Sequence, residues 1–327
     1  MNIEDFINRV EKEYGKNIYV PMDTEEDFDV ISTGSLSLDI ASGIGGLPTR
    51  KMIEIYGAEG SGKSTLSLIV SKNYIESYDK HVAYVDVENM TFPDYVKQIF
   101  GYDPKDRFHL FHPLTSEDSL SIAEESIKSG LFGVVVIDSI GALSPRKEVE
   151  SDLDKDSYSG SAKLLARFLR RITPYVNHNN VMVIFINQVR DNVGSYVGGY
   201  TTPGGHSLKH FTTIRLMLSA STKIQDDKDI IGNYVKFVYK KNKVAPPFMS
   251  GEFPLIFGKG IDYITDVINV ATKFGILIRR GSYYYFEGEQ IGQGSKQVAD
   301  KLGSDNEILD RIIKMCYNIA NIGTEEV

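Results

Sequence analysis

The most constraining stretch of the chain is GAEGSGKST at residues 57–65, which fits the pattern G-x-x-x-x-G-K-[ST]. The residues before it, MIEIY at 52–56, predict a short buried strand, and residues 66–74 continue with the apolar spacing of a helix. A glycine-rich turn between a strand and a helix gathers backbone N–H groups that bind phosphate oxygens. An ordinary structural turn with a surface lysine is the alternative. The strand and the helix on either side favour a nucleoside triphosphate site.

Each residue of this loop has a predicted part in the site. Lys63 is expected to reach the β- and γ-phosphates, and the hydroxyl of Ser64 is expected to hold Mg²⁺. The predicted nucleotide-binding residues of the loop are Gly57, Ala58, Glu59, Gly60, Ser61, Gly62, Lys63, Ser64 and Thr65. The sequence therefore predicts a site for ATP, or a similar nucleotide, together with Mg²⁺.

From residue 31 onward, β-branched runs alternate with segments of helical spacing. The expected strands are residues 82–87, 133–138, 181–187, 213–218 and 234–239, and the expected helices are residues 120–128 and 162–176. Continuous apolar strands separated by helices are what a mainly parallel sheet, covered on both faces, requires. We therefore expect an α/β domain that extends to about residue 260.

The composition limits the class of protein. A chain of 327 residues has room for one large core domain and small appendages. Cys316 is the single cysteine, which excludes an intramolecular disulfide framework and fits a reducing compartment. No apolar run approaches the roughly 20 residues that cross a bilayer, and the amphipathic N-terminus is unlike a signal peptide. We expect a cytoplasmic protein that makes no membrane contact.

Both ends of the chain predict appendages to the core. At the N-terminus, Ile3, Phe6, Ile7, Val10 and Tyr14 fall on one face at helical spacing, and a charged linker at residues 19–29 follows. This helix is either a flap on its own domain or an arm that docks on a neighbouring subunit. After residue 260, a helix, a Tyr-rich hairpin and two more helices predict a small α+β unit. The expected domains are residues 1–30, 31–260 and 261–327.

Three polar residues follow predicted strands. Asp138 closes the strand at 133–138, where a carboxylate beside a phosphate loop orients the Mg²⁺ shell. Glu88 lies just beyond the strand at 82–87, in a position to orient or deprotonate water, although a solvated loop glutamate is the alternative. Gln188 follows the strand at 181–187, and an amide there can contact a terminal phosphate. Because parallel strands end at one edge of the sheet, all three are expected at the same edge.

A second group of residues has the ingredients of a single-strand nucleic-acid site. Four cations, Lys163, Arg167, Arg170 and Arg171, share one face of the helix at 162–176, and a solvated face is the usual explanation of such a pattern. A long glycine-rich loop after residue 189 carries Arg190, Tyr196, Tyr200 and Lys209. Cations bind phosphates and aromatic rings stack on bases. Two features oppose this interpretation, namely the net charge of −8 and five acidic residues between 148 and 156.

These features resemble the RecA recombinase family of bacteria and bacteriophages. The similar segments run in order from ISTGSLSLDIA, which starts at residue 31, through the phosphate loop, VIDSIGALSP, IFINQVR, TTPGGHSLK and KNKVAPPF to IGQG at 291–294. They cover at least three quarters of the chain, which is far more specific than a phosphate loop alone. The resemblance implies a RecA-type P-loop ATPase core with a mainly parallel sheet, an N-terminal helical oligomerisation arm and a small α+β C-terminal domain.

The resemblance also implies a function. It predicts a DNA-dependent ATPase that forms an ATP-dependent helical filament on single-stranded DNA. The filament would pair that strand with a homologous duplex and exchange strands in DNA repair. The expected partners are therefore single-stranded DNA, double-stranded DNA and further copies of the chain, in a filament or a ring.

The resemblance assigns roles by position. Asp138 supports the metal, Glu88 activates water and Gln188 senses the γ-phosphate. Lys241 and Lys243 reach the ATP bound by the neighbouring subunit, as an arginine finger does in trans. Tyr95 corresponds to the aromatic residue that stacks on adenine, and Phe257 lies nearby. The two DNA loops correspond to residues 148–159 and 189–203. The expected DNA-binding residues are Lys163, Arg170, Arg190, Gly204 and Gly205.

Several positions depart from the family pattern. Phe92 stands where an aspartate is common near adenine, and Phe257 replaces a tyrosine, which bears on base selectivity. His210 occupies a position where the family has an aromatic residue that takes part in communication between subunits. The second loop is a residue shorter, with Asp191 and Asn192 in place of an expected positive charge. The last residues are GTEEV at 323–327, so the extended acidic tail expected from relatives is almost absent. These departures indicate a divergent member of the family.

Two other functions compete with this interpretation. A hexameric helicase has the same core, but the paired lysines of KNK, the TTPGG segment and the lack of an arginine-finger signature disfavour it. A filament that serves as an ATP-switched scaffold, for example for repressor cleavage in a DNA-damage response, is an addition to strand exchange more than a rival.

Overall fold

The structure is a computed structural model that describes residues 2–15, 19, 21–22, 29–146, 160–191 and 200–322. For residues 190–191 and 200–201 it describes the backbone alone. Most of the expected linker, the whole first DNA loop at 148–159, the middle of the second loop and the end of the chain at 323–327 therefore lie outside the described residues.

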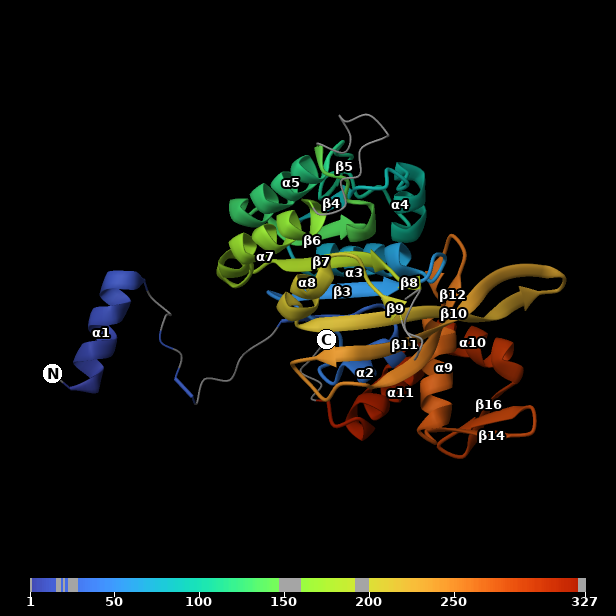
Figure 1. The fold of residues 1–327 in the computed structure, drawn as a ribbon. Coiled ribbons are helices and arrows are strands. Elements are labelled where there is room, and N and C mark those ends of the chain that lie inside the picture. Colours follow the sequence, from blue (N-terminus) through green and yellow to red (C-terminus); the bar gives the residue numbers. More distant parts are fainter. Residues whose placement is uncertain are drawn as a thin grey trace.

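The body of the protein is built on a nine-stranded sheet in the order β13-β12-β11-β10-β3-β7-β6-β4-β5 (Figure 1). Its strands are β3 (Met52–Gly57), β4 (His81–Asp86), β5 (Phe108–Phe111), β6 (Phe132–Asp138), β7 (Met182–Gln188), β10 (Ile214–Asp226), β11 (Asp229–Asn242), β12 (Ser250–Ile256) and β13 (Gly260–Ile261). From β10 to β5 the neighbouring strands pair in parallel, and from β10 to β13 they pair antiparallel. The expected mainly parallel α/β sheet is confirmed.

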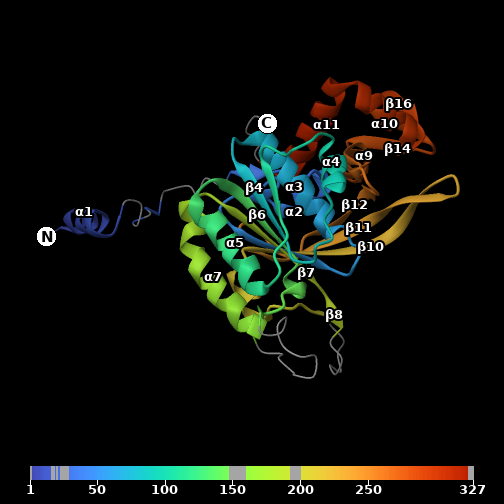
Figure 2. The same ribbon diagram turned by 90° about the horizontal axis from the view of Figure 1, so that it is seen from above.

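Helices cover both faces of this sheet, as the continuous apolar strands require (Figure 2). The helices of the body are α2 (Leu36–Ser42), α3 (Lys63–Ser77), α4 (Pro93–Phe100), α5 (Ser116–Ser129), α7 (Gly160–His178) and α8 (Gly205–Phe211), with a short 3₁₀ helix, η1, at Ile140–Ala142. One apolar core includes side chains of α2, α3 and α4, and a second includes side chains of α5, α7 and α8. Each fully buried leucine in these cores contributes about 2 kcal/mol by leaving water.

The antiparallel part of the sheet is larger than the sequence predicts. Strands β10 and β11 are 13 and 14 residues long, and their far ends form a hairpin that projects beyond the body (Figure 1). The expected strands at 213–218 and 234–239 are the inner halves of this hairpin. The outer halves are mostly exposed and polar, so they lack the apolar run on which the prediction depends. Register shifts along the pair add further irregularity.

A small C-terminal unit packs against the body through α9. It contains α9 (Tyr263–Lys273), β14 (Leu277–Arg280), β15 (Tyr283–Phe286), β16 (Glu289–Gln293), α10 (Gly294–Ser304) and α11 (Asn306–Ile319). The expected helix, Tyr-rich hairpin and two final helices are all present. Asp266 of α9 accepts hydrogen bonds from the Ser35 hydroxyl at 2.7 Å and from the Ser37 N–H at 3.0 Å, at the start of α2. These bonds join the unit to the body.

Helix α1 (Ile3–Tyr14) stands apart from the body in both views (Figures 1 and 2). Asn2 caps it, because the Asn2 side chain accepts from the Asp5 N–H while the Asp5 side chain accepts from the Asn2 N–H. None of residues 3–14 is buried, so the apolar face of α1 has no partner within the described part of this chain.

A short two-stranded ladder, separate from the main sheet, pairs β1 (Val30–Ile31) with β2 (Leu47–Pro48). No described helix has the length and apolarity needed to cross a bilayer.

Candidate functional site

The phosphate loop connects β3 to α3 at the carboxyl edge of the sheet. Gly60 and Gly62 have φ values of +69° and +84°, which an L-residue with a side chain adopts only under strain. At Gly57 a Cβ atom would come within 2.1 Å of the Leu218 carbonyl oxygen, because β10 runs directly alongside. The glycines of the motif are therefore required by backbone shape, and the loop presents its N–H groups at the start of α3.

Lys63, the first residue of α3, lies inside this loop. Its side chain is buried, and its ammonium group donates a hydrogen bond to the Ala58 carbonyl oxygen at 2.8 Å. Burial lowers the pKa of Lys63, while the nearby carboxylates of Asp138 and Glu88 act in the opposite direction. A cation held in a poorly solvated loop is a strong partner for a phosphate anion.

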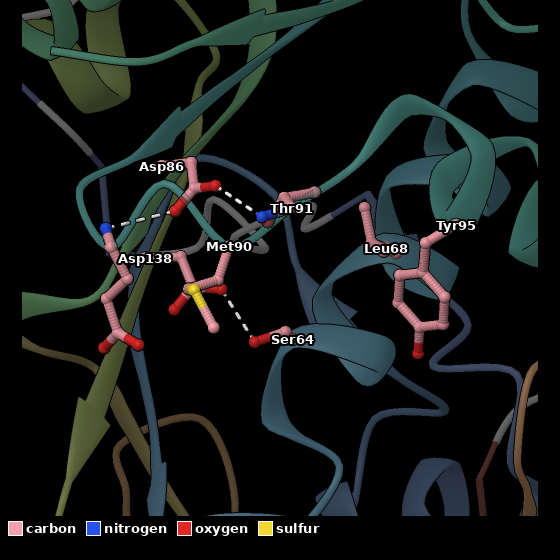
Figure 3. Close-up of a pocket in the computed structure, with 8 residues that line it drawn as sticks. Ser64, Leu68, Asp86, Met90, Thr91, Tyr95 and Asp138 are labelled. Atoms are coloured by element: carbon pink, nitrogen blue, oxygen red, sulfur yellow. Dashed lines mark hydrogen bonds between the residues drawn. The ribbon is translucent and has the colours of Figure 1, made fainter.

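Ser64 and Asp138 meet across the sheet edge. The Ser64 hydroxyl donates to Asp138 at 2.7 Å, and the buried Tyr84 hydroxyl donates to the same carboxylate oxygen at 2.6 Å. Burial raises the pKa of Asp138, although both hydrogen bonds favour its ionised form. Ser64, Asp86, Tyr95 and Asp138 line one pocket of about 90 Å³ (Figure 3).

Glu88 faces the same edge from the turn after β4. One of its oxygens accepts hydrogen bonds from the Ser139 hydroxyl and from the Gln188 side-chain amide, the latter at 3.0 Å. The turn is held by buried Asp86, whose carboxylate accepts from the N–H groups of Glu88 at 3.1 Å and of Thr91 at 2.7 Å. The structure thus brings together Lys63, Ser64, Glu88, Asp138 and Gln188, as the sequence predicts.

This arrangement fits a magnesium nucleotide. Mg²⁺ prefers oxygen ligands and is usually held by one or two carboxylates together with substrate phosphates. Ser64 and Asp138 supply a hydroxyl and one carboxylate beside the loop. Across the described ranges there is no group of three or more His, Cys, Asp or Glu residues that could hold a metal ion without such a substrate. The residues therefore fit Mg²⁺ that arrives with a nucleotide.

Tyr95 lies beside the phosphate loop, and two further aromatic residues predicted to lie near the base are exposed. The Tyr95 hydroxyl is hydrogen-bonded to the Thr65 hydroxyl at 2.6 Å, which fixes the ring of Tyr95 beside the start of α3. Phe92 and Phe257 are 65% and 54% exposed, so both rings remain available for contact. Phe257 follows β12, a strand that the sequence analysis does not predict.

The two lysines of KNK differ in their surroundings. Lys241 donates to the carbonyl oxygens of Lys209 at 2.7 Å and His210 at 3.0 Å, in the last turn of α8. Burial, with Lys243 and Arg215 as cationic neighbours, lowers the pKa of Lys241 to about 8. Lys243 is exposed just beyond β11.

The predicted cationic face of α7 is divided in the structure. All four cations are exposed, and Arg171 is in addition paired with Glu124 of α5 at 2.7 Å. Arg167 and Arg171 also line a groove between α5 and α7, together with Leu120 and Phe168. The shared track of four cations stays a prediction, with Arg167 and Arg171 lying on the side of α7 that faces α5. Lys163 and Arg170 remain the predicted DNA-binding residues of this helix.

The two ends of the second loop are held together by a short ladder. Strand β8 (Arg190–Asp191) pairs antiparallel with β9 (Tyr200–Thr201), so its two ends lie side by side. Gly204, with φ +91°, is the N-cap of α8, and Gly205 follows with φ +66°. Residues 192–199, and with them Tyr196, lie outside the described part of the chain.

Some residues of the site were not found from the sequence. They are Glu54, Tyr84, Asp86 and Arg215, which contact residues of the site or one another. Their common signal is a polar side chain at a position where the strand pattern predicts burial. Glu54, for example, interrupts the apolar run 52–56 and is fully buried. A buried polar group requires a partner, so such interruptions can be sought in advance.

A phosphate loop at the carboxyl edge of a mainly parallel sheet, with a carboxylate at each of two further strand ends, defines a P-loop ATPase core. Family models agree, because the RecA N-terminal domain matches residues 1–262 and the RecA C-terminal domain matches residues 265–317. Protein RecA of Francisella tularensis subsp. novicida (strain U112) is 38% identical over 315 residues, which cover 95% of this chain and 87% of that protein. Protein RecA of Francisella tularensis subsp. tularensis (strain SCHU S4 / Schu 4) has the same identity and coverage.

A solved structure adds an independent likeness. The crystal structure of the RadB recombinase matches with a TM-score of 0.54 and 26% sequence identity, over 71% of this chain and 98% of that chain. The chain therefore belongs to the RecA family, whose members are ATP-binding proteins of DNA recombination and repair.

Proposed function

We propose that this protein is a DNA-dependent ATPase that assembles head to tail on single-stranded DNA and exchanges strands with a homologous duplex. Residues 31–260 would form the ATPase core, residues 1–30 the oligomerisation arm and residues 261–327 the C-terminal domain. The substrate would be ATP with Mg²⁺, and the compartment would be the cytoplasm.

The observation that carries this proposal is the hydrogen bond between Gln188 and Glu88. It joins a residue at the root of the second loop to a carboxylate at the phosphate site, within one subunit. An amide and a carboxylate at a terminal phosphate can serve hydrolysis alone, but here the amide also lies at the root of the second loop, where it can relay nucleotide state to that loop. A protein whose DNA affinity depends on nucleotide needs a residue that contacts both.

Each residue of the site has a distinct task in this proposal. Bound magnesium ATP would supply the γ-phosphoryl group that is transferred to water. Lys63 and the loop N–H groups neutralise and orient the phosphates, and Ser64 and Asp138 hold the metal. Glu88, oriented by Ser139, accepts a proton from the attacking water or orients that water. Gln188 turns from Glu88 to the terminal phosphate and shifts the second loop.

Assembly would use α1 and the two lysines of KNK. The apolar face of α1 contains no buried residue, so it is available to dock on an adjacent core. A contact between different surfaces of two copies need not close, and repeated contacts of this kind generate a helix. Lys241 and Lys243 would then face the phosphates bound by the next subunit.

DNA would bind where the two loops meet the exposed part of α7. Lys163, Arg170 and the N–H groups at Gly204 and Gly205 offer positive partners for a phosphate backbone. Arg190, at the root of the second loop, would add another charge. The overall negative charge of the protein makes this local track the main source of attraction.

The test is ATP hydrolysis measured with and without single-stranded DNA over a series of salt concentrations. We expect DNA to stimulate turnover, and the stimulation to weaken as salt rises, because phosphate contacts release counterions. If DNA binds equally well with ATP, with ADP and without nucleotide, the proposed coupling is wrong. Opening of a forked duplex without a homologous partner would support a helicase instead.

A further inference from the structure

A row of polar side chains crosses four neighbouring strands of the sheet beneath α8. The strands β11, β10, β3 and β7 are adjacent, and they contribute Lys241, Arg215, Glu54 and Asn187 respectively. Glu54 is completely buried, Asn187 is also completely buried, and the Arg215 side chain is only 14% exposed. Charged groups in such a place are expensive unless they are paired and hydrogen-bonded.

Within this row, Glu54 is hydrogen-bonded to the residue on either side of it. One oxygen of Glu54 accepts from the Asn187 amide at 3.0 Å, and the other accepts from the guanidinium of Arg215. The guanidinium also lies over the ring of Tyr56, with its central carbon 4.6 Å from the ring centre. Arg215 is paired in register with Lys241 on the next strand.

The two ends of the row hold the two ends of α8. At one end, the Asn187 amide donates to the Pro203 carbonyl oxygen at 2.9 Å, immediately before Gly204, the N-cap of α8. At the other end, Lys241 donates to the carbonyl oxygens of Lys209 and His210 in the last turn of the same helix. Hydrogen bonds join the side chains of Asn187, Glu54 and Arg215, and Arg215 in turn meets Lys241 through the pairing of β10 with β11 and through the repulsion between the two positive charges.

We propose that Glu54 and Arg215 are positioning residues that couple the subunit face to the second loop, by holding α8 between Asn187 and Lys241. In this arrangement Lys241 has two alternative partners, the last carbonyls of α8 and the phosphates of the neighbouring subunit. When Lys241 moves to the phosphates, it releases the C-terminal end of α8. Glu54 and Arg215 transmit the change in Lys241 to Asn187 and to the chain at Pro203. This inference rests on the proposed function, because it requires ATP between subunits.

The test compares Glu54→Gln, Arg215→Met and Arg215→Lys with the wild type. Glu54→Gln keeps the shape of the side chain and removes its charge, and Arg215→Lys keeps a cation but loses the planar fork. The readouts are the affinity of the DNA-free protein for a fluorescent ATP analogue and the ratio of turnover with single-stranded DNA to turnover without it. Asp39→Asn is the matched control, because it alters another fully buried carboxyl group, in α2, which packs into the other of the two cores from α8.

We expect Glu54→Gln and Arg215→Met to lower the DNA stimulation ratio by about tenfold, within the usual range of coupling between sites. Affinity for the ATP analogue should stay within about twofold of wild type, and Arg215→Lys should recover part of the ratio. Asp39→Asn should leave the ratio unchanged. If Glu54→Gln does not fold, the two Arg215 variants decide the question.

Two results would overturn the inference. One is a ratio that stays at the wild-type value in folded Arg215→Met. The other is a loss of ATP-analogue affinity in parallel with the ratio, which would show a general structural role. If the wild type itself shows no DNA stimulation, the proposed function fails first, and the two failures are therefore distinguishable.

Discussion

The side-chain amide of Gln188 donates a hydrogen bond to Glu88 across 3.0 Å. The same Glu88 oxygen accepts from the Ser139 hydroxyl, so two donors engage one oxygen of the residue proposed to activate water. A terminal phosphate carries more charge than a carboxylate, and hydrogen bonds to charged acceptors strengthen with that charge. We therefore expect phosphate to draw Gln188 from Glu88, which frees the Glu88 oxygen and moves the root of the second loop in one step.

Gln188→Met should separate nucleotide binding from DNA binding. Methionine has a similar length but no amide, so it can bond neither to Glu88 nor to a phosphate. We expect ATP to bind normally while single-stranded DNA binds with the same affinity with and without ATP. Fluorescence anisotropy of labelled DNA measures this. Gln225→Met, at an exposed position of the projecting hairpin, is the control. A variant that still tightens on DNA when ATP is added would remove Gln188 from this role.

Glu88→Gln should stop hydrolysis without preventing assembly. The amide keeps the hydrogen-bonding shape of the side chain but cannot accept a proton, and loss of a general base costs about 10²- to 10⁴-fold in rate. We expect a stable complex of protein, ATP and single-stranded DNA that does not turn over. Phosphate release and DNA dissociation rates are the measurements, and Glu125→Gln on the exposed face of α5 is the control. Full turnover in Glu88→Gln would assign water activation to another group.

Much of this site can be predicted because its residues lie at the ends of buried strands. The phosphate loop, Asp138, Glu88 and Gln188 each follow an apolar run that the sequence shows directly. The parallel arrangement of those runs then brings the residues to one edge. The helices between the strands can also be predicted, because α5 and α7 bury one face and expose the other, and this gives their sequences an apolar period of about 3.6 residues.

Other parts of the site depend on contacts that no local pattern contains. The rotation of Arg171 toward Glu124 depends on where α5 packs against α7, and this is a tertiary property. The outer halves of β10 and β11 have exposed positions and lack a continuous apolar run, and β12 contains Pro254, a residue that argues against a strand. The partner of Lys241 is also absent from the sequence pattern, because its bonds go to the backbone of α8. Backbone carbonyls have no side-chain signature.

Lys163→Ala and Arg170→Ala should each weaken DNA binding and reduce its salt dependence. Both side chains are exposed on α7, the helix that begins directly after the first DNA loop. Loss of one phosphate contact lowers the slope of log affinity against log salt by about 0.7 for single strands. Arg171→Ala is the matched control on the same helix, since Arg171 is already paired with Glu124. Equal effects of all three substitutions would indicate that the charge of α7 acts only through its sum.

Asp39→Asn should change the pH dependence of stability. Asp39 is fully buried and accepts hydrogen bonds from the Ser32 hydroxyl and from both the N–H and the hydroxyl of Thr33. Burial raises the pKa of Asp39 to about 7, from an ordinary value of 3.8. Between these values the folded protein keeps a proton that the unfolded chain releases. The free energy of unfolding therefore falls as pH rises from about 4 to about 7, and this contribution is constant above that window.

The asparagine variant lacks this titration, so its stability relative to wild type should increase as pH rises from about 4 to about 7. A shift of about three pKa units corresponds to at most about 4 kcal/mol. Urea unfolding at several pH values measures the difference, and Asp106→Asn corrects for the loss of one negative charge at an exposed position. Asp266, whose pKa burial also raises, stays in both proteins, and its charge is one of the causes that raise the pKa of Asp39. A difference that is constant with pH would mean that Asp39 is ionised throughout, held by its three donors.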